Sequence, residues 1–173
     1  AKVAAEDLEL EQIDVKTAFL NGELSEAVWV KQPEGYEQGG NELICHLNNA
    51  LYGLKQAPRA WHAKLNAVLQ QLGLTASLAD PGQYYKHTAA GSTYMAVWVD
   101  DSMLATTSKA LMQESKQGVL SVFEARDLGE ARNFVGLEIR RNRAERTLSI
   151  SQAKMTADIV SRYGQESARS RDV

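Results

Sequence analysis

Residues 94–105 read Tyr-Met-Ala-Val-Trp-Val-Asp-Asp-Ser-Met-Leu-Ala, and the rest of the chain is organised around them. The apolar, β-prone run before Asp100 and the short apolar run after Asp101 predict a tight β-hairpin with two carboxylates at its tip. Adjacent carboxylates repel each other, so keeping both ionised beside an apolar sheet normally requires a counter-charge, for which a divalent cation is the obvious candidate. The alternative is a solvated turn, because Asp is a common turn residue. A second acidic strand end would favour the metal.

The composition is that of a soluble globular domain. The chain has 173 residues, of which 44% are hydrophobic and 24% charged, and a net charge of −3; this length suffices for one domain with a real core. No run approaches the roughly 18 apolar residues of a membrane span, and no signal peptide opens the chain, so we expect no membrane partner. The single Cys45 excludes an internal disulfide, which favours a reducing, intracellular setting. The chain starts with Ala-Lys, without an initiator Met, and we expect a piece of a larger protein.

The first half of the chain supplies the second acidic strand end. Residues 1–8 have helical composition, and residues 10–15 are predicted to form a strand whose end carries Asp14. A tight turn or short helix over 16–22 follows, with backbone amides able to face a phosphate group. Short strands are expected at 27–31 and 43–47. A helix then starts at Pro58; its core face comprises Trp61, Leu65, Val68, Leu69 and Leu72.

The second half predicts a strand over 83–87, the central hairpin and two more helices. Ser108 is expected to cap a helix that points Leu111, Met112, Val119, Leu120 and Phe123 inward, and residues 127–129 to end that unit. Residues 133–139 and 148–150 are predicted to form a second hairpin. Ser151 is expected to cap the last helix, closed by Gly164, before a loose tail over 165–173. The plan is an α+β fold with a small, mainly antiparallel sheet and helices on one face.

Three Asp residues at two neighbouring strand ends favour phosphoryl transfer. Asp14, Asp100 and Asp101 offer the hard oxygen ligands that two Mg²⁺ ions prefer, and such a pair of ions supports in-line displacement at phosphorus. The absence of His and Cys from this group disfavours a zinc hydrolase. No P-loop motif is present, and the hairpin counts against a receiver-type phosphoacceptor domain, which needs a parallel sheet. An unrelated Mg²⁺-dependent phosphotransfer domain remains an alternative.

Basic residues cluster in the loop of the second hairpin. Four arginines fall within seven positions: Arg140, Arg141, Arg143 and Arg146. The net negative charge argues against a simple backbone-binding module, yet a local basic patch can still bind phosphates on a mildly acidic protein. A solvated hairpin loop explains the same charges equally well.

Four strings of the sequence resemble the reverse transcriptase of Ty1/copia-type LTR retrotransposons. They occur in the family's order over about residues 8–164, and the first two are long enough to be highly specific. They are Gln-Ile-Asp-Val-Lys-Thr-Ala-Phe-Leu-Asn-Gly (12–22), Ala-Leu-Tyr-Gly-Leu-Lys-Gln-Ala-Pro-Arg-Ala-Trp (50–61), Val-Asp-Asp (99–101) and Phe-Val-Gly-Leu-Glu-Ile (134–139). The resemblance implies a palm-like antiparallel sheet with helices on one face, with partial fingers and the start of a thumb.

The resemblance also implies a role for each matching position. Asp14, Asp100 and Asp101 would bind two Mg²⁺ ions, or Mn²⁺, together with the backbone of Val15. The segment Lys16, Thr17 and Ala18 would lie along the incoming triphosphate, Phe19 would exclude a 2′-hydroxyl, and Gln56 would contact the nucleotide or template base. Without the resemblance, Phe19 is equally an ordinary core aromatic. The primer grip, which presents the primer 3′-hydroxyl, would comprise Phe134, Val135, Gly136 and Leu137.

By the same resemblance, residues 1–164 form the reverse transcriptase palm core. It divides into partial fingers and palm (about 8–130), a primer-grip hairpin (131–150) and the start of the thumb (151–164). The implied partners are an RNA or DNA template-primer, deoxynucleoside triphosphates and the rest of a polyprotein with fingers, thumb and ribonuclease H. The setting would be cytoplasmic, in a virus-like particle, or nuclear.

Four positions depart from the family's usual residues: Trp98 for Tyr, Asn48 and Asn49 for a commonly basic pair, and Met155 for Tyr. None of these departures removes a predicted metal ligand. Two readings of the chain remain open at this point. One is an RNA-directed DNA polymerase fragment; the other is an inactive, truncated relic that keeps the fold as a nucleic-acid- or protein-binding fragment.

Overall fold

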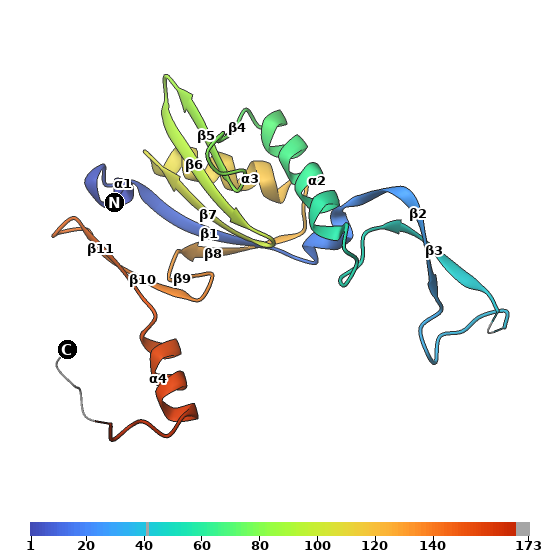
Figure 1. Cartoon of the computed structure of the whole chain (residues 1–173). Helices are drawn as coiled ribbons and strands as arrows, with labels where there is room; N and C mark the ends of the chain where they lie inside the picture. The colour runs from blue at the N-terminus through green and yellow to red at the C-terminus, as the bar shows by residue number, and fades with distance from the viewer. Residues whose placement is uncertain (41, 169–173) are drawn as a thin grey trace.

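A six-stranded antiparallel sheet forms the body of the protein (Figure 1). The computed structural model describes residues 1–40 and 42–168. Strand order across the sheet is β4-β5-β6-β7-β1-β8, and every neighbouring pair is antiparallel. The strands are β1 (Glu9–Val15), β4 (Thr75–Ala76), β5 (Gln83–Thr88), β6 (Gly91–Trp98), β7 (Asp101–Thr106) and β8 (Ala125–Glu130). The predicted central hairpin is therefore confirmed as β6 and β7, and it lies beside β1.

Helices α2 (Ala57–Gln71) and α3 (Lys109–Leu120) cover one face of this sheet (Figure 1). Pro58 stands in the first turn of α2, where its missing N–H costs nothing. Ser108 caps α3 as predicted, because its hydroxyl accepts a hydrogen bond from Leu111 N–H at 3.3 Å. The predicted core stripe of α2 is buried except for the partly buried Leu72, and it packs on Ile13, Val15 and Leu104 of the sheet.

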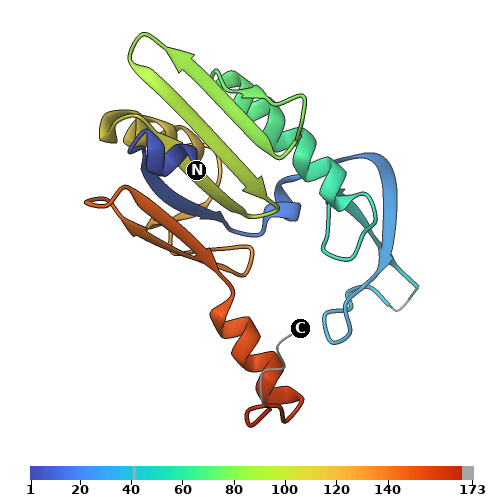
Figure 2. The same cartoon turned by 60° about the vertical axis from the view of Figure 1, so that its left-hand side comes forward.

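A smaller apolar cluster lies on the opposite face of the sheet. Leu10 and Ala105 point there because side chains alternate along a strand. They meet Leu8 of the chain entering β1, Ala131 of the link between β8 and β9, and Ile139 of a three-stranded sheet. That sheet comprises β9 (Asn133–Phe134), β10 (Leu137–Asn142) and β11 (Thr147–Ser151). This second sheet and α1 (Lys2–Ala5) therefore cover only part of that face (Figure 2).

Two elements extend away from the sheet (Figures 1 and 2). The ribbon of β2 (Glu23–Lys31) and β3 (Ile44–Asn49) follows the 3₁₀ helix η1 (Ala18–Asn21). At the other end, α4 (Ala153–Arg162) has no buried residue, and Met155, Ile159 and Tyr163 of its apolar side are exposed. No helix among residues 1–40 and 42–168 is long and apolar enough to span a membrane.

Several predicted elements are wrong in detail. Residues 127–129 do not end a unit but lie inside β8, where Gly129 and the polar run 125–130 form an edge strand that weak β-propensity concealed. Residues 133–139 do not form one strand, because Val135 and Gly136 both have positive φ and make the turn between β9 and β10. Val135 and Leu137 consequently do not share one face of a strand.

The chain ends also differ from the predictions. Ser151 is the last residue of β11, and the N-cap of α4 is Gln152, whose side chain makes no capping hydrogen bond. Helix α1 is shorter than the predicted 1–8, because Asp7 has φ 48° and turns the chain into β1. Gly164 closes α4 with φ 60°, as predicted. Of the predicted tail, 165–168 form a turn and the remainder lies outside the described residues.

A buried lysine joins α3 to two strands of the sheet. The Lys116 side chain is 4% exposed, and its ammonium pairs with Glu11 of β1 and with Asp127 of β8 at 2.6 Å. Burial disfavours the charged form of Lys116, but the hydrogen bonds that its ammonium donates to Asp127 and Glu11 outweigh this effect and raise its pKa. The hydrogen bond from Lys116 in turn lowers the pKa of Asp127. The charge is therefore kept inside the protein, where it fixes β8 against the helix.

We expect Lys116→Met to lower the free energy of unfolding by about 1–3 kcal/mol at pH 7, less than for a fully buried pair because both carboxylates reach solvent. The folded-state pKa of Asp127 is lowered, so its contribution is complete above the unfolded pKa near 4 and is lost as the pH falls through the folded value. The difference in the free energy of unfolding between wild type and variant should therefore become smaller as the pH falls below about 4.

Urea unfolding at a series of pH values measures this difference. Lys109→Met, at the exposed first position of the same helix, is the matched control. An equal effect of the two substitutions, or a difference that does not change with pH, would contradict the role assigned to Lys116.

Candidate active site

The antiparallel register of β1 and β7 brings two of the predicted carboxylates face to face. Asp14 is the direct cross-strand partner of Asp101. Asp100 is the second residue of the two-residue turn between β6 and β7, directly before Asp101. Its C=O accepts a hydrogen bond from Val15 N–H at 2.8 Å. All three Asp residues are partly exposed. The structure therefore brings together, at one end of one sheet, the three residues that the sequence predicted as a group.

Asp14 and Asp101 point away from the helices. Ile13 and Val15 belong to the core beneath α2, so Asp14 between them points to the other face. On the same face, the amide of Gln12 donates to Asp101 Oδ1 at 2.6 Å. The carboxylates thus lie on the face that the second sheet leaves partly open, while the helix-covered face provides the rigid support beneath them.

The electrostatics of this end of the sheet are unfavourable to anions. Burial raises the pKa of Asp101, and the neighbouring charges of Asp14 and Asp100 raise it further. Gln12 and the backbone amide of Val135 oppose this shift without cancelling it. Among residues 1–40 and 42–168, none of the three carboxylates forms an ion pair with a lysine or arginine. A cation at this place would relieve the repulsion.

The donor chemistry suits a hard divalent cation, since all three side chains offer carboxylate oxygens and no sulfur or imidazole lies among them. The geometry is less complete. Within the described part of the chain, no three His, Cys, Asp or Glu side chains are gathered closely enough to hold a metal ion. The two-Mg²⁺ site therefore stays a prediction that rests on donor type, register and charge.

The segment after Asp14 turns sharply and packs on α2. Thr17 has the left-handed φ of 48°, and the amide of Asn21 donates to Thr17 C=O at 3.2 Å, which closes the turn into η1. Ala18 is buried, and the Lys16 ammonium pairs with Glu124. Gly22 is required because a Cβ there would lie 2.7 Å from the backbone nitrogen of Trp61. The predicted triphosphate segment is thus held against the helix.

Phe19 belongs to η1, and Gln56 directly precedes α2. The Phe19 ring is partly buried against the core and lies 4.7 Å, between centroids, from the ring of Tyr52. Gln56 is the partly exposed N-cap residue of α2. The family-based roles of both residues remain predictions, and for Phe19 the packing on Tyr52 is equally consistent with a core aromatic.

The predicted primer grip adjoins the carboxylates through its backbone. Val135 and Gly136 form the β9–β10 turn, and the Val135 amide, like the side chain of Gln12, favours the ionised form of Asp101. Phe134 packs with the smaller apolar cluster, and Leu137 pairs with it across the turn.

The sequence predicted the primer-grip residues to lie near the site but did not identify Gln12. The signal was available, because a residue two positions before Asp14 in a strand lies on the same face.

The structure does not bring the four arginines together as one free basic surface. Arg141 is 7% exposed and binds Asp7 at 2.7 Å, and it also donates to Leu8 C=O. Arg143 pairs with Glu9 at 2.8 Å. These two arginines tie the second sheet to the chain entering β1, so their main contacts are structural. Arg140 and Arg146 are exposed, and a nucleic-acid contact remains a prediction for them.

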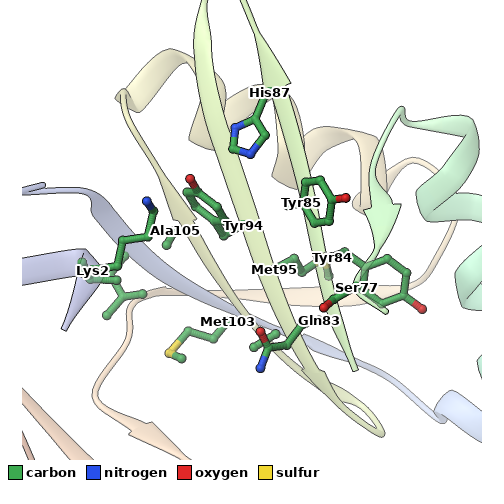
Figure 3. Close-up of a pocket in the computed structure, with 13 residues that line it drawn as sticks. Lys2, Ser77, Gln83, Tyr84, Tyr85, His87, Tyr94, Met95, Met103 and Ala105 are labelled. Atoms are coloured by element: carbon green, nitrogen blue, oxygen red, sulfur yellow. The ribbon is translucent and has the colours of Figure 1, made fainter. Parts of the chain in front are cut away.

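A cavity of about 530 Å³ lies on the same face of the sheet, over β5, β6 and β7 (Figure 3). Its wall includes Tyr85, His87 and Tyr94, and the Lys2 ammonium lies 5.1 Å from the centre of the Tyr94 ring. None of the predicted site residues lines it. The cavity and the carboxylates are therefore separate features of one face.

The protein has a mixed α and β architecture, in which an antiparallel sheet carries helices on one face and paired carboxylates at one strand end of the other. Comparison with known families assigns it more closely: residues 1–171 match the family described as reverse transcriptase (RNA-dependent DNA polymerase). The chain belongs to this family and is a copia-type reverse transcriptase domain.

Relatives from plants and yeast agree. The chain is 37% identical over 168 residues to the retrovirus-related Pol polyprotein from transposon TNT 1-94 of Nicotiana tabacum, covering 96% of this chain and 13% of that protein. It is 36% identical over 131 residues to the putative transposon Ty5-1 protein of Saccharomyces cerevisiae, covering 75% and 42%. It is 30% identical over 161 residues to the Pol polyprotein from transposon RE2 of Arabidopsis thaliana, covering 92% and 11%. The chain thus spans less than half the length of each of these relatives.

The hydrogen bond from Gln12 and the charge of Asp14 shift the pKa of Asp101 in opposite directions. We expect Gln12→Leu to raise the pKa of Asp101 and Asp14→Asn to lower it. A ¹³C NMR titration of the aspartate carboxyl groups in metal-free buffer measures both changes. Gln38→Leu, on the exposed ribbon, is the control and should change nothing. A shift of the same sign in both variants would show that Asp101 responds to a loss of packing and not to these two neighbours.

Proposed function

We propose that this chain carries the catalytic centre of an RNA-directed DNA polymerase and adds deoxynucleotides to a primer 3′-hydroxyl. The observation that supports this proposal is the pairing of Asp14 with Asp101 across β1 and β7, with Asp100 in the adjoining turn. The sheet that carries them would then be the polymerase palm, β2 and β3 part of the fingers, and α4 the start of the thumb. The carboxylates face away from α2 and α3, so a template-primer has a side of the sheet from which to approach.

The residues suited to hold two Mg²⁺ ions are Asp14, Asp100 and Asp101, with the backbone of Val15 beside them. When bound, the ions would activate the attacking hydroxyl and neutralise charge on the leaving oxygen. The raised pKa of Asp101 in the metal-free protein is consistent with this role, because a site built for cations holds its anions under mutual repulsion when the cations are absent.

The reaction forms one bond and breaks one. The primer 3′-oxygen attacks the α-phosphorus of the triphosphate and loses its proton, while the bond between the α-phosphorus and the bridging oxygen breaks and pyrophosphate leaves. The chain contributes mainly positioning, which is a large part of catalysis when two reactants must meet in line. Lys16 to Ala18 would orient the triphosphate, Gln56 the base, and the β9–β10 turn at Phe134–Leu137 the primer end.

The rest of the function lies in polypeptide beyond these residues. We propose that template-primer binding also needs the remaining fingers and thumb of a Pol polyprotein, and that ribonuclease H belongs to the same polyprotein. The exposed apolar side of α4, at Met155, Ile159 and Tyr163, would contact such a segment or the nucleic acid. The setting we propose is intracellular, in a cytoplasmic virus-like particle or in the nucleus.

Primer extension tests the proposal directly. The chain is supplied with an RNA template, a DNA primer, deoxynucleotides and Mg²⁺, and is compared with Asp100→Asn, which keeps the shape of the side chain and removes its charge. We expect extension that falls at least about 100-fold in the variant. Asp80→Asn is the matched control, because Asp80 is an exposed turn residue whose Oδ1 accepts from Gly82 N–H. Absence of extension by the wild-type chain would support the inactive-relic alternative for this chain.

The selectivity of extension for deoxynucleotides over ribonucleotides tests the role of Phe19. If its ring lies under the sugar, Phe19→Val should make room for a 2′-hydroxyl and raise ribonucleotide incorporation relative to deoxynucleotides by about 10- to 200-fold. Single-nucleotide extension with each triphosphate measures the ratio of kcat/KM values. Tyr36→Val, on the exposed end of the ribbon, is the control. An unchanged ratio would leave Phe19 as an aromatic that only packs on Tyr52.

A further inference from the structure

Among residues 1–40 and 42–168, three β-branched residues have backbone conformations that such residues rarely adopt. Thr17, Val99 and Val135 have φ values of 48°, 55° and 50°. A branched Cβ clashes with the backbone in this left-handed region, so each is a genuine conformational outlier. All three border the candidate active site: one follows Asp14, one precedes Asp100, and one adjoins Asp101. Such strain persists only where surrounding groups hold the backbone in place.

Val99 has the most direct connection to the carboxylates. It is the first of two residues in the turn between Trp98 and Asp101, which are cross-strand partners. Hairpin turns that need positive φ at this position usually have glycine there. If Val99 relaxed to negative φ, the turn would change shape, and Asp100 and Asp101 would move relative to Asp14. Something in the protein must therefore hold Val99.

The group that holds it comes from α2. The indole Nε1–H of Trp61 donates a hydrogen bond to Val99 C=O at 2.7 Å. Trp61 itself is 3% exposed, and its ring meets Phe123 edge-to-face at 5.0 Å between centroids. A buried indole N–H is a donor that needs a partner. Its rigid position in the core makes it a fixed anchor for a turn that lies at the edge of the core.

We propose that Trp61 is a positioning residue for the aspartate hairpin: its indole holds Val99 in the strained conformation and thereby places Asp100 and Asp101 opposite Asp14. The inference rests on the proposed function for its catalytic meaning, although the hydrogen bond and the strain do not depend on it. A second hydrogen bond, from Val15 N–H to Asp100 C=O, joins backbone groups only and involves no atom of Trp61. Trp61 acts through Val99 and does not itself contact the reacting groups.

Hydrogen exchange tests the anchor in the wild-type protein. The three tryptophans give an internal comparison, since Trp29 and Trp98 are 57% and 61% exposed. In ¹H–¹⁵N spectra we expect the indole N–H of Trp61 to exchange much more slowly than the other two. Exchange of Trp61 as fast as that of Trp29 would overturn the proposal without any substitution.

A double-mutant cycle then separates anchoring from general core packing. Trp61→Phe keeps an aromatic ring in the core and removes the donor, and Val99→Gly removes the strain. We expect Trp61→Phe to speed exchange of the Asp101 and Ser102 amides by about 3- to 10-fold when residue 99 is Val, and by less than about twofold when it is Gly. Trp29→Phe should have no effect. Equal effects of Trp61→Phe in the two backgrounds would overturn the proposal, because a packing defect does not depend on the residue at 99.

Steady-state kinetics test whether the anchoring of Val99 by Trp61 affects primer extension. Trp61→Phe should lower kcat for primer extension by about 3- to 10-fold with little change in KM for the deoxynucleotide, and Val99→Gly should restore much of the loss. A lowered kcat that Val99→Gly leaves unrestored would overturn the positioning role. If the wild-type chain shows no extension, the proposed function fails, while the exchange experiments still decide whether Trp61 anchors the hairpin.

Discussion

The register between β1 and β7 is the constraint on which the rest of the structure depends. It pairs residues 9–14 with residues 106–101, so that Ile13 and Leu104 point to the helices while Asp14 and Asp101 point to the other face. Side chains alternate along a strand, and a slip of one residue would exchange the two sets, exposing the core and burying two carboxylates. The apolar residues therefore determine where the charged ones go: the burial of Ile13, Val15 and Leu104 beneath α2 and α3 places the aspartates.

The site contains groups whose burial, charge or backbone conformation each destabilises the folded protein. Asp101 is partly buried beside two other carboxylates, and three β-branched residues adopt left-handed φ around it. Each costs free energy, so the remainder of the fold must compensate. The compensation is visible in the core under the hairpin, in the amide of Gln12 and in the pairing of Lys116 with Glu11 and Asp127, which fixes β8 beside β1. The rigid, helix-covered face of the sheet therefore compensates for the strained and charged residues on the opposite face.

Exposed apolar side chains lie on the two elements that project from the central sheet. The chain spans 13% of the tobacco relative and 11% of the Arabidopsis one. Large apolar side chains remain exposed on the β2–β3 ribbon, at Trp29, Leu43 and Ile44, and along α4. Exposed apolar groups that are clustered on projecting elements are typical of surfaces that contact other polypeptide or nucleic acid. The central sheet, in contrast, has one face buried beneath α2 and α3 of the same chain.

The sequence by itself determined the elements whose pattern is local. The β-prone apolar runs and the turn residues within 94–105 predicted the hairpin, and the 3.6-residue stripe from Trp61 to Leu72 predicted α2. The two Asp-bearing strand ends predicted the three carboxylates as a group. Tertiary structure decided what depends on residues distant in the chain. The polar run 125–130 became a strand because β1 offered it an unpaired edge, and Arg141 became buried because Asp7 and Leu8 C=O lie opposite it. Likewise, Gln12 and Trp61 acquired their roles from partners 89 and 38 residues away, which no local pattern encodes.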